Sequence, residues 1–518
     1  VGTSALDANT TGDSNVAMGD SALGANTTAD NNTAVGTSAL AANTTGTQNV
    51  AVGRSALDAN TTGDYNIAVG GHALGANTTA DFNSAFGYGS LQGNTTGANN
   101  TALGYAALSN NTTAAHNTAV GKSALTANTT GNTNTALGGR ALQTNTTGDR
   151  STAVGFQALA TQNPTANADM YNTAMGYNAG TSVTTGVQNT LIGGLVGDAI
   201  TTGNYNVGVG YTSLSANTTG ESNVGIGNFA LSANTTASNN TAVGQSALLA
   251  NTTGAYNVAV GMGALDANTT AANNTAVGYL SLSANTTGAQ NTAFGESALA
   301  STTTGGGNTA LGREAGKNVT GTHNTCVGNQ AGDAITTGSN NLILGKGCAA
   351  SAVDAEVQLV LGANATCVGN GNFTIGNGST DSNIQLGATS ITAPSDVRLK
   401  EDIQDEEIGL DFINDLRPVT FQWKKEKDIP SEMKAYKEGS EERTMNGKYN
   451  HGFIAQEVKE TIDSHNLKEG FDMWSEDEAD GRQRVAPNAL MSVMVKAVQE
   501  LSTQVDELKQ ELKTLKGE

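Results

Sequence analysis

A block of 17 residues recurs through the first two-thirds of the chain. Copies of the pattern Asn-Thr/Val-Ala-Val/Leu-Gly-x-Ser-Ala-Leu-x-Ala-Asn-Thr-Thr-Gly-x-x start at Asn15, Asn32, Asn49 and onward at the same interval to Asn134. A four-residue insertion near 164–171 interrupts the count, which resumes at Asn172 and runs to about residue 348. A unit this short cannot hold a pair of helices, so each copy is predicted to be one coil of a β-solenoid or β-roll. One coil cannot bury its own apolar face, and stability therefore has to come from stacking.

Two positions of the repeat are large and apolar. The fourth holds residues such as Val35 and Phe86, and the ninth holds Leu40 and its equivalents. We predict that these two columns form the core, and that the alanine at the third position faces a closely packed opposite side. The fifth-position glycine suits a positive φ, and Asn-Thr-Thr-Gly supplies turn chemistry. Roughly twenty coils at ~4.8 Å each predict a rod of about 100 Å.

The Asn-Thr-Thr turn permits other interpretations. Each copy is formally a glycosylation sequon, but its regular place in a turn explains it without sugar. Regular threonine pairs are typical of an ice-binding face, although the flanking positions vary freely in size and charge. Calcium-binding rolls need regular aspartates, and here aspartates are scattered. The favoured interpretation is a stiff spacer whose exposed loops contact a receptor.

Composition limits the classes of partner that the chain is expected to bind. The net charge of −21 argues against nucleic acid and against an anionic membrane surface. No apolar run of 18 residues exists, so membrane insertion is not expected. Because Val1 lies inside a repeat, we expect the sequence to be a fragment of a longer chain. Cys326, Cys348 and Cys367 lack CxxC spacing and are interpreted as buried small residues, with one bridge between subunits left open. No metal or cofactor is expected.

Charge also divides the chain at residue 395. Residues 1–394 hold 25 charged side chains, and the last 124 residues hold 46. We predict a fibre at 1–348, a β-rich neck at 349–394 and a separate domain at 395–518. The neck contains short alternating runs at 357–361, 373–375 and 384–386, which are predicted to be strands.

The last domain has its own pattern. A helix should lead into a strand through Arg417-Pro418, a charged loop should cover 424–449, and a strand at 452–455 should enter a helix at 456–461. Residues 462–484 are acidic and are predicted to be mobile. The segment 489–516 is predicted to be a coiled coil. Its apolar seam steps by three and four residues: Met491, Met494, Val498, Leu501, Val505, Leu508, Leu512 and Leu515.

Two resemblances follow from these motifs. The NTAVG and NTTG repeats resemble the head repeats of trimeric autotransporter adhesins and repeats of phage tail fibres, which implies a trimeric, left-handed parallel β-roll. The final domain resembles the self-cleaving intramolecular chaperone of phage endosialidase tailspikes. The matching motifs are Ser-Asp-x-Arg-Leu-Lys at 395–400, Leu-Arg-Pro-Val at 416–419, Phe-Gln-Trp at 421–423 and Gly-Phe-Ile-Ala-Gln-Glu at 452–457.

The second resemblance implies site residues. Ser395 would be the nucleophile and Lys400 its base, because a serine hydroxyl needs an adjacent base and burial can keep a lysine neutral. Asp396 and Arg398 would position the pair. Gln456 and Glu457 would line the site. The bond to be cut lies beside Ser395, with Pro394–Ser395 the first choice.

The predicted fold class is therefore mainly β, a trimeric β-solenoid followed by an α+β chaperone ending in a trimeric coiled coil. We expect a structural fibre, of a phage tail or a cell surface, whose last domain trimerises the chain and then cuts itself off in a single turnover. The fibre part is not expected to be an enzyme. A cell-surface glycan or protein is the candidate external partner. The alternative is an adhesin or ice-binding rod whose trimerisation domain does not cleave.

Overall fold

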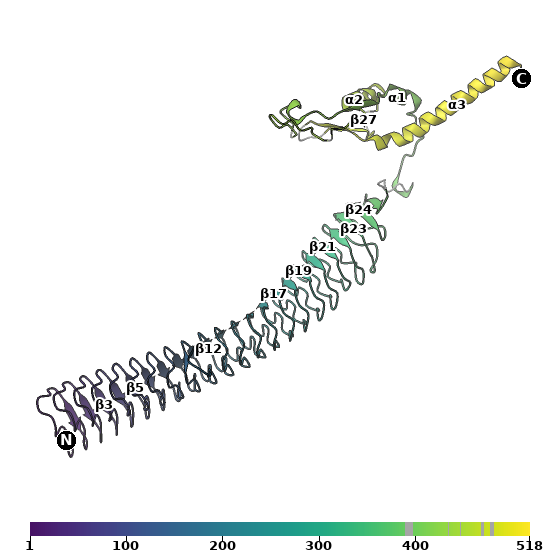
Figure 1. The fold of residues 1–518 in the computed structure, drawn as a ribbon. Helices are drawn as coiled ribbons and strands as arrows, with labels where there is room; N and C mark the ends of the chain where they lie inside the picture. The colour runs from purple at the N-terminus through teal and green to yellow at the C-terminus, as the bar shows by residue number, and fades with distance from the viewer. Residues whose placement is uncertain (389–396, 434, 446, 468–470, 477–480, 518) are drawn as a thin grey trace. The chain divides into compact units, whose positions relative to one another are not determined.

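The computed structural model describes residues 1–388, 397–433, 435–445, 447–467, 471–476 and 481–517. The chain forms two compact units, Val1–Pro394 and Ser395–Glu518. The first is a stack of coils, each of which adds one short strand to a single sheet (Figure 1). The second is a small α+β unit that ends in a long helix.

Successive strands of the first unit pair in parallel and in register. Thr33 lies beside Val50, Ala34 beside Ala51 and Val35 beside Val52, so every residue meets its equivalent one coil away. The mainly β parallel solenoid predicted from the period is thus confirmed. Its periodic strands are β1 (Val16–Met18), β2 (Thr33–Val35), β3 (Val50–Val52), β4 (Ile67–Val69), β5 (Ser84–Phe86), β6 (Thr101–Leu103), β7 (Thr118–Val120), β8 (Thr135–Leu137), β10 (Thr152–Val154), β12 (Thr173–Met175), β13 (Thr190–Ile192), β14 (Val207–Val209), β15 (Val224–Ile226), β16 (Thr241–Val243), β17 (Val258–Val260), β18 (Thr275–Val277), β19 (Thr292–Phe294), β20 (Thr309–Leu311), β21 (Thr325–Val327) and β22 (Leu342–Leu344).

The interior of each coil is narrow and holds small side chains. The central alanine of a strand, such as Ala34, and the ninth-position leucine, such as Leu40, are fully buried. The fourth-position column lies outside instead, with Met18 53% and Leu311 49% exposed. This half of the predicted core is wrong for the single chain. Side chains alternate along a strand, so when the third position points inward the second and fourth must point outward.

Two ladders of asparagine fill the rest of the interior. At the twelfth position, Asn43 donates through Nδ2 to Asn26 Oδ1 at 3.0 Å and to the Gly46 carbonyl at 2.8 Å. At the first position, the backbone N–H of Asn49 donates to Asn32 Oδ1 at 2.9 Å. These asparagines are fully buried, and the bonds satisfy their amides inside the lumen. The twelfth-position asparagine is that of the Asn-Thr-Thr sequon, so stacking buries the acceptor of this particular sequon.

The turn after each strand has an unusual backbone. Gly36 has φ of 135°, as predicted for the fifth position, but Ser38 and Leu40 also have positive φ values of 57° and 52°. A left-handed conformation costs a non-glycine residue roughly 1–2 kcal/mol. Stacking offsets this cost, because the Leu40 N–H donates to the Ala56 carbonyl of the next coil at 3.0 Å.

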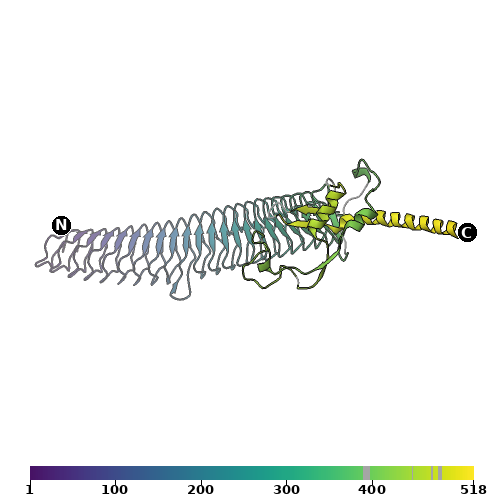
Figure 2. The same cartoon turned by 90° about the horizontal axis from the view of Figure 1, so that it is seen from above.

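The sheet continues through the predicted neck. Strands β23 (Leu359–Gly362) and β24 (Asn372–Gly376) extend the parallel ladder, and β25 (Ser382–Gln385) closes it antiparallel. The insertion forms a second small pair, β9 (Gly148–Asp149) with β11 (Ala168–Asp169), held by an ion pair of Arg150 with Asp169. The inserted loop projects from the stack in Figure 2.

The three cysteines are buried in the solenoid with free thiols. Cys326 takes the place of the strand alanine, and burial raises the pKa of its thiol to about 12. Their interpretation as small core residues is confirmed. A bridge between subunits does not fit thiols that lie inside the coil.

The second unit packs short elements around the start of its last helix. Its elements are η1 (Val397–Leu399), α1 (Leu410–Asp415), β26 (Val419–Phe421), η2 (Glu426–Asp428), β27 (Asn450–Gly452), α2 (Ala455–Ser464), β28 (Trp474–Glu476), β29 (Gln483–Val485), η3 (Pro487–Ala489) and α3 (Leu490–Lys516). The core is formed by Phe412, Leu416, Val458, Ile462, Met473, Leu490 and Val493. The segment 462–484, predicted to be mobile, contains regular structure in its described residues, because β28 pairs with β29 and Met473 is fully buried.

No helix within the described ranges has the length and apolarity to cross a membrane.

Candidate functional site

The sequence motifs of the second unit converge in space. Strand β26, from the Leu-Arg-Pro-Val motif, pairs antiparallel with β27, which leads into Gly-Phe-Ile-Ala-Gln-Glu. Val419 lies beside Gly452 and Phe421 beside Asn450. Phe421 also packs edge-to-face on Trp423, with 5.3 Å between the ring centroids. Segments thirty residues apart in the chain therefore form one small platform.

An ion pair joins the same motifs at the start of α2. Arg417 Nε donates to Glu457 Oε2 at 3.0 Å, and a terminal guanidinium nitrogen donates to the other carboxylate oxygen. The hydrogen bond to Glu457 raises the pKa of Arg417. Such a bidentate pair fixes orientation as well as distance. Glu457 was predicted to line the site, whereas Arg417 entered the sequence analysis only as part of a motif. The predicted neighbour Gln456 is exposed.

Of the predicted catalytic pair, the structure describes Lys400 but not Ser395. Ser395 and Asp396 lie outside the described residues, so the Ser395–Lys400 dyad stays a prediction. Arg398 belongs to the exposed turn η1, and the backbone N–H of Lys400 donates to the Val397 carbonyl at 3.2 Å. The Lys400 side chain is exposed in the single chain. Burial would have to come from elsewhere for this lysine to act as a neutral base.

Helix α3 has two different faces. Leu490, Val493 and Ala497 are buried against the unit's core. Glu500 Oε2 accepts a 2.7 Å hydrogen bond from the Leu410 N–H and so ties α3 to the start of α1. The eight residues of the predicted coiled-coil seam are instead exposed, from 41% at Val505 to 84% at Leu515. An exposed apolar row of this length on one helix lacks its packing partner in the single chain.

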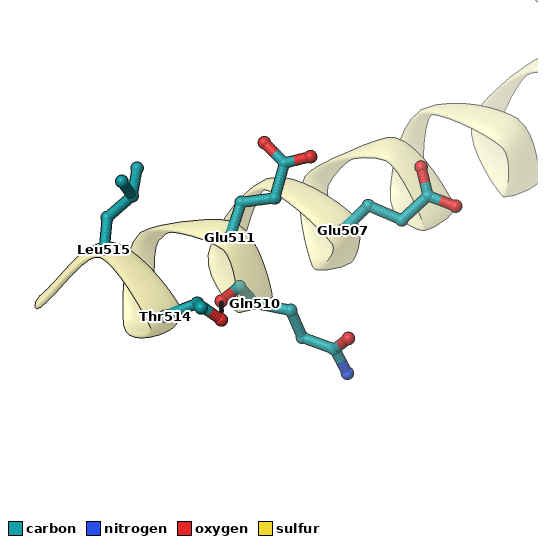
Figure 3. A pocket seen from close by; sticks show the side chains of 5 residues that line it. All are labelled: Glu507, Gln510, Glu511, Thr514 and Leu515. Atoms are coloured by element: carbon teal, nitrogen blue, oxygen red, sulfur yellow. Dashed lines mark hydrogen bonds between the residues drawn. The ribbon is translucent and has the colours of Figure 1, made fainter. Parts of the chain in front are cut away.

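Figure 3 shows the end of α3. A hollow of about 590 Å³ lies along this helix and is lined by Glu507, Gln510, Glu511, Thr514 and Leu515. All five come from one helix, so the hollow is an open strip and no substrate site. A second hollow, of about 270 Å³, lies between α2 and β28 and includes Lys459, whose ammonium group sits 5.3 Å from the Trp474 ring centroid.

Charged pairs hold the loop between β26 and β27. Glu441 accepts hydrogen bonds from Lys425 and Lys427, which lower the pKa of its carboxyl to about 2. Lys437 bonds Glu426 at 2.9 Å. The loop predicted as acidic and basic is therefore closed on itself by opposite charges. Within the described part of the chain, no group of three or more His, Cys, Asp or Glu side chains is arranged to hold a metal ion.

Comparison with known proteins gives one match. Residues 395–467 match the family described as the chaperone of endosialidase. The match covers the segment from the Ser-Asp-x-Arg-Leu-Lys motif through α2 and supports a chaperone role for it. Neither the curated proteins nor the solved structures gave a match. The platform of β26 and β27, the Arg417–Glu457 pair and η1 all lie inside the matched residues.

Proposed function

We propose that this chain is a homotrimeric fibre protein whose C-terminal unit assembles three copies and then releases itself by cutting beside Ser395. The observation that carries this proposal is the exposed apolar seam of α3, which lies in the same compact unit as a segment that matches a chaperone family. A seam with heptad spacing buries its side chains only against equivalent helices of other copies. The solenoid adds a second unpartnered face, the outward apolar column of its strands.

The cleavage chemistry uses Ser395 and Lys400. The Ser395 hydroxyl attacks the Pro394 carbonyl carbon, and the neutral Lys400 amine takes the hydroxyl proton. The Pro394–Ser395 amide bond breaks, and the Ser395 nitrogen leaves as an amine with the proton returned by Lys400. Water then hydrolyses the resulting ester. The products are residues 1–394 and 395–518, and each chain reacts once.

Assembly would supply the burial of Lys400 that the single chain lacks. Lys400 is exposed here, whereas a lysine that serves as a base has to be held in its neutral form by burial. Packing of three C-terminal units around the α3 seam would desolvate the turn that bears Lys400 and favour its neutral form. Cleavage would then follow assembly and never precede it. The Arg417–Glu457 pair serves as a positioning contact that holds α2 to the platform.

Intact-mass measurement of the purified chain tests the proposal. Wild type should yield two fragments whose masses place the cut beside Ser395, and Ser395→Ala should remain a full-length trimer. Lys400→Arg keeps the charge but has no neutral amine, so it should also assemble and stay whole. Ser379→Ala, which changes an exposed serine of the solenoid, is the matched control and should cleave as wild type does. An uncut wild type that has folded into a trimer would contradict the protease part.

The alternative is a rod whose C-terminal unit only trimerises. The coils give an ice-binding face little support, because the hydroxyl of the first threonine of the turn donates to the next coil. Thr44 Oγ1, for example, donates to the Thr61 carbonyl at 3.0 Å. The second threonine column is the more exposed of the two, as Thr28 and Thr62 are exposed and Thr27 and Thr61 are half-buried. A Lys400→Ala chain indistinguishable from wild type in mass and assembly would favour this alternative.

A further inference from the structure

The outward strand face carries no charge. In twenty coils, the second position is always Thr, Ser, Val, Ile or Leu and the fourth always Val, Leu, Ile, Met or Phe. The chain as a whole has a net charge of −21, so two copies repel unless they meet across uncharged surface. Rows about 4.8 Å apart and about 10 Å wide make roughly 1,000 Å² of such face per copy. A stable interface needs about 800 Å² per partner, and a second copy of this chain presents an uncharged face of the same length and row spacing.

Two further columns border this face. We call the residue before the first-position Asn the leading edge, and the residue after the fifth-position Gly the trailing edge. Each edge carries large exposed side chains in some coils, all between 44% and 62% exposed. The leading-edge residues are Tyr65, Phe82, Tyr171, Tyr205 and Tyr256. The trailing-edge residues are Tyr88, Tyr105, Phe156, Tyr177, Tyr211, Met262 and Tyr279.

Neighbours within an edge stack along the rod. The rings of Tyr65 and Phe82 are 5.0 Å apart and nearly parallel, and those of Tyr88 and Tyr105 are 5.9 Å apart. Their outer surfaces stay exposed, so stacking within the chain leaves each column able to contact another molecule.

The two edges are occupied in the same coils. Four of the five coils with a leading-edge aromatic also have Tyr or Met at the trailing edge, although only seven of the twenty coils have Tyr, Phe or Met there. We call these four coils the paired layers. They are Phe82 with Tyr88, Tyr171 with Tyr177, Tyr205 with Tyr211, and Tyr256 with Met262. Residues at opposite borders of one strand have no need of each other within a chain, and a contact between chains would account for the coincidence.

We propose that the leading edge of each copy packs against the trailing edge of the next copy at the same height, so that the paired layers set the register of the trimer. The inference rests on the proposed homotrimer. Rotational symmetry brings unlike edges together at every interface and repeats the same contact around the ring. Each paired layer then places an aromatic ring on a Tyr or Met of the neighbour, a contact that is favourable beyond simple burial.

The spacing of the paired layers makes the register specific. They lie five, two and three coils apart along the rod. In register, each of the three interfaces has four such contacts. When one copy is displaced by one coil, the three interfaces have four, three and one such contacts. The solenoid therefore carries its own alignment signal, in addition to the one that α3 provides.

Site-directed cross-linking of the full chain tests this. Tyr205→Cys with Tyr211→Cys places both thiols in one paired layer, whereas Phe82→Cys with Tyr211→Cys places them seven coils, or roughly 34 Å, apart. A short bis-maleimide should join the first variant into covalent trimers and leave the second as single chains in denaturing gels. The chain without introduced cysteines should stay unjoined, because its own thiols are buried.

The outcomes separate this inference from the proposed function. A trimer by native mass measurement without same-layer cross-links would overturn the inference alone and leave the edges to another ligand, such as a sugar stacked on the rings. Equal cross-linking of the offset variant would overturn it as well. So would cross-linking of Tyr205→Cys alone, since like edges would then meet. A monomer would overturn the proposed function and the inference together.

Discussion

At the scale of single residues, the solenoid conserves the volume of its lumen. Four coils have Gly in place of the ninth-position Leu, and the same four have Val or Ile in place of the twelfth-position Asn. At Gly197 an added Cβ would lie 2.7 Å from Cδ1 of Ile200, so the larger side chain occupies the space that the missing leucine leaves. Close-packed interiors tolerate such exchanges only when the total volume is kept. The twelfth-position asparagine ladder and the ninth-position leucine column thus pack as one unit.

Adjacent glycines give a sharp test of this packing. Gly138 has φ of 137°, and a Cβ there would lie 2.4 Å from the Gly155 carbonyl oxygen of the next coil. Gly138→Ala should therefore destabilise its coils by about 1–3 kcal/mol. In hydrogen exchange, amides of residues 121–155 should exchange roughly 5- to 150-fold faster.

The control is the next residue. At Gly139 a Cβ would make ordinary contact with the Phe156 ring at 3.4 Å. Gly139→Ala should leave the exchange of the same amides close to wild type. If both variants behaved alike, the close approach of successive coils at the fifth position would not limit stability.

At the scale of elements, α3 joins two tasks on one helix. Its first turns complete the core of the C-terminal unit, and the exposed seam runs from there to its end. Leu490, Val493 and Ala497 occupy one face while Met491, Met494 and Val498 occupy the other, so folding of a single unit presents the seam in a fixed direction. In the proposed trimer, folding of each unit and assembly of the three copies would be linked through this helix.

Changing one seam residue should abolish assembly. Leu508→Asp removes an apolar side chain whose burial contributes roughly 1.5–3 kcal/mol in each copy, and it places three carboxylates together. In a Ser395→Ala background, which keeps the unit attached, sedimentation should show loss of the trimer. Gln510→Asp alters an exposed residue off the seam and should sediment as the parent does. A trimeric Leu508→Asp chain would show that α3 is not the assembly element.

The loop between β26 and β27 should respond to acid. Hydrogen bonds from Lys425 and Lys427 lower the pKa of Glu441 from 4.5 to about 2. A lowered folded-state pKa stabilises the closed loop above the ordinary value, and this contribution is lost as the pH falls toward 2. Carboxyl-carbon NMR should show Glu441 titrating near 2, with Glu441→Gln identifying its signal. Glu438, exposed in the same loop, is the comparison. A Glu441 midpoint near 4.5 would rule out the pairing in solution.

At the scale of the whole molecule, period and composition were enough to predict the parallel stack and its leucine column. They did not show which strand face turns inward, because alternation separates two faces without saying which is covered. The asparagine ladders were missed for a related reason, since asparagine beside glycine is usual in exposed turns. The candidate site of the second unit was predicted only as separate sequence motifs, without the contacts between them. The Arg417–Glu457 contact spans forty residues of sequence and arises only when β26 pairs with β27.

The buried Asn-Thr-Thr asparagines also set a condition on how the rod is made. Each is a chemical acceptor for oligosaccharide while its coil is unfolded, and is sealed once its amide bonds to the next coil. In a secretory pathway that transfers sugars to nascent chains, stacking would compete with modification in a kinetic race. A single modified asparagine would be enough to end the stack, since a sugar has no space in the lumen. Intact rods therefore require either a compartment without such transfer or stacking that outpaces it.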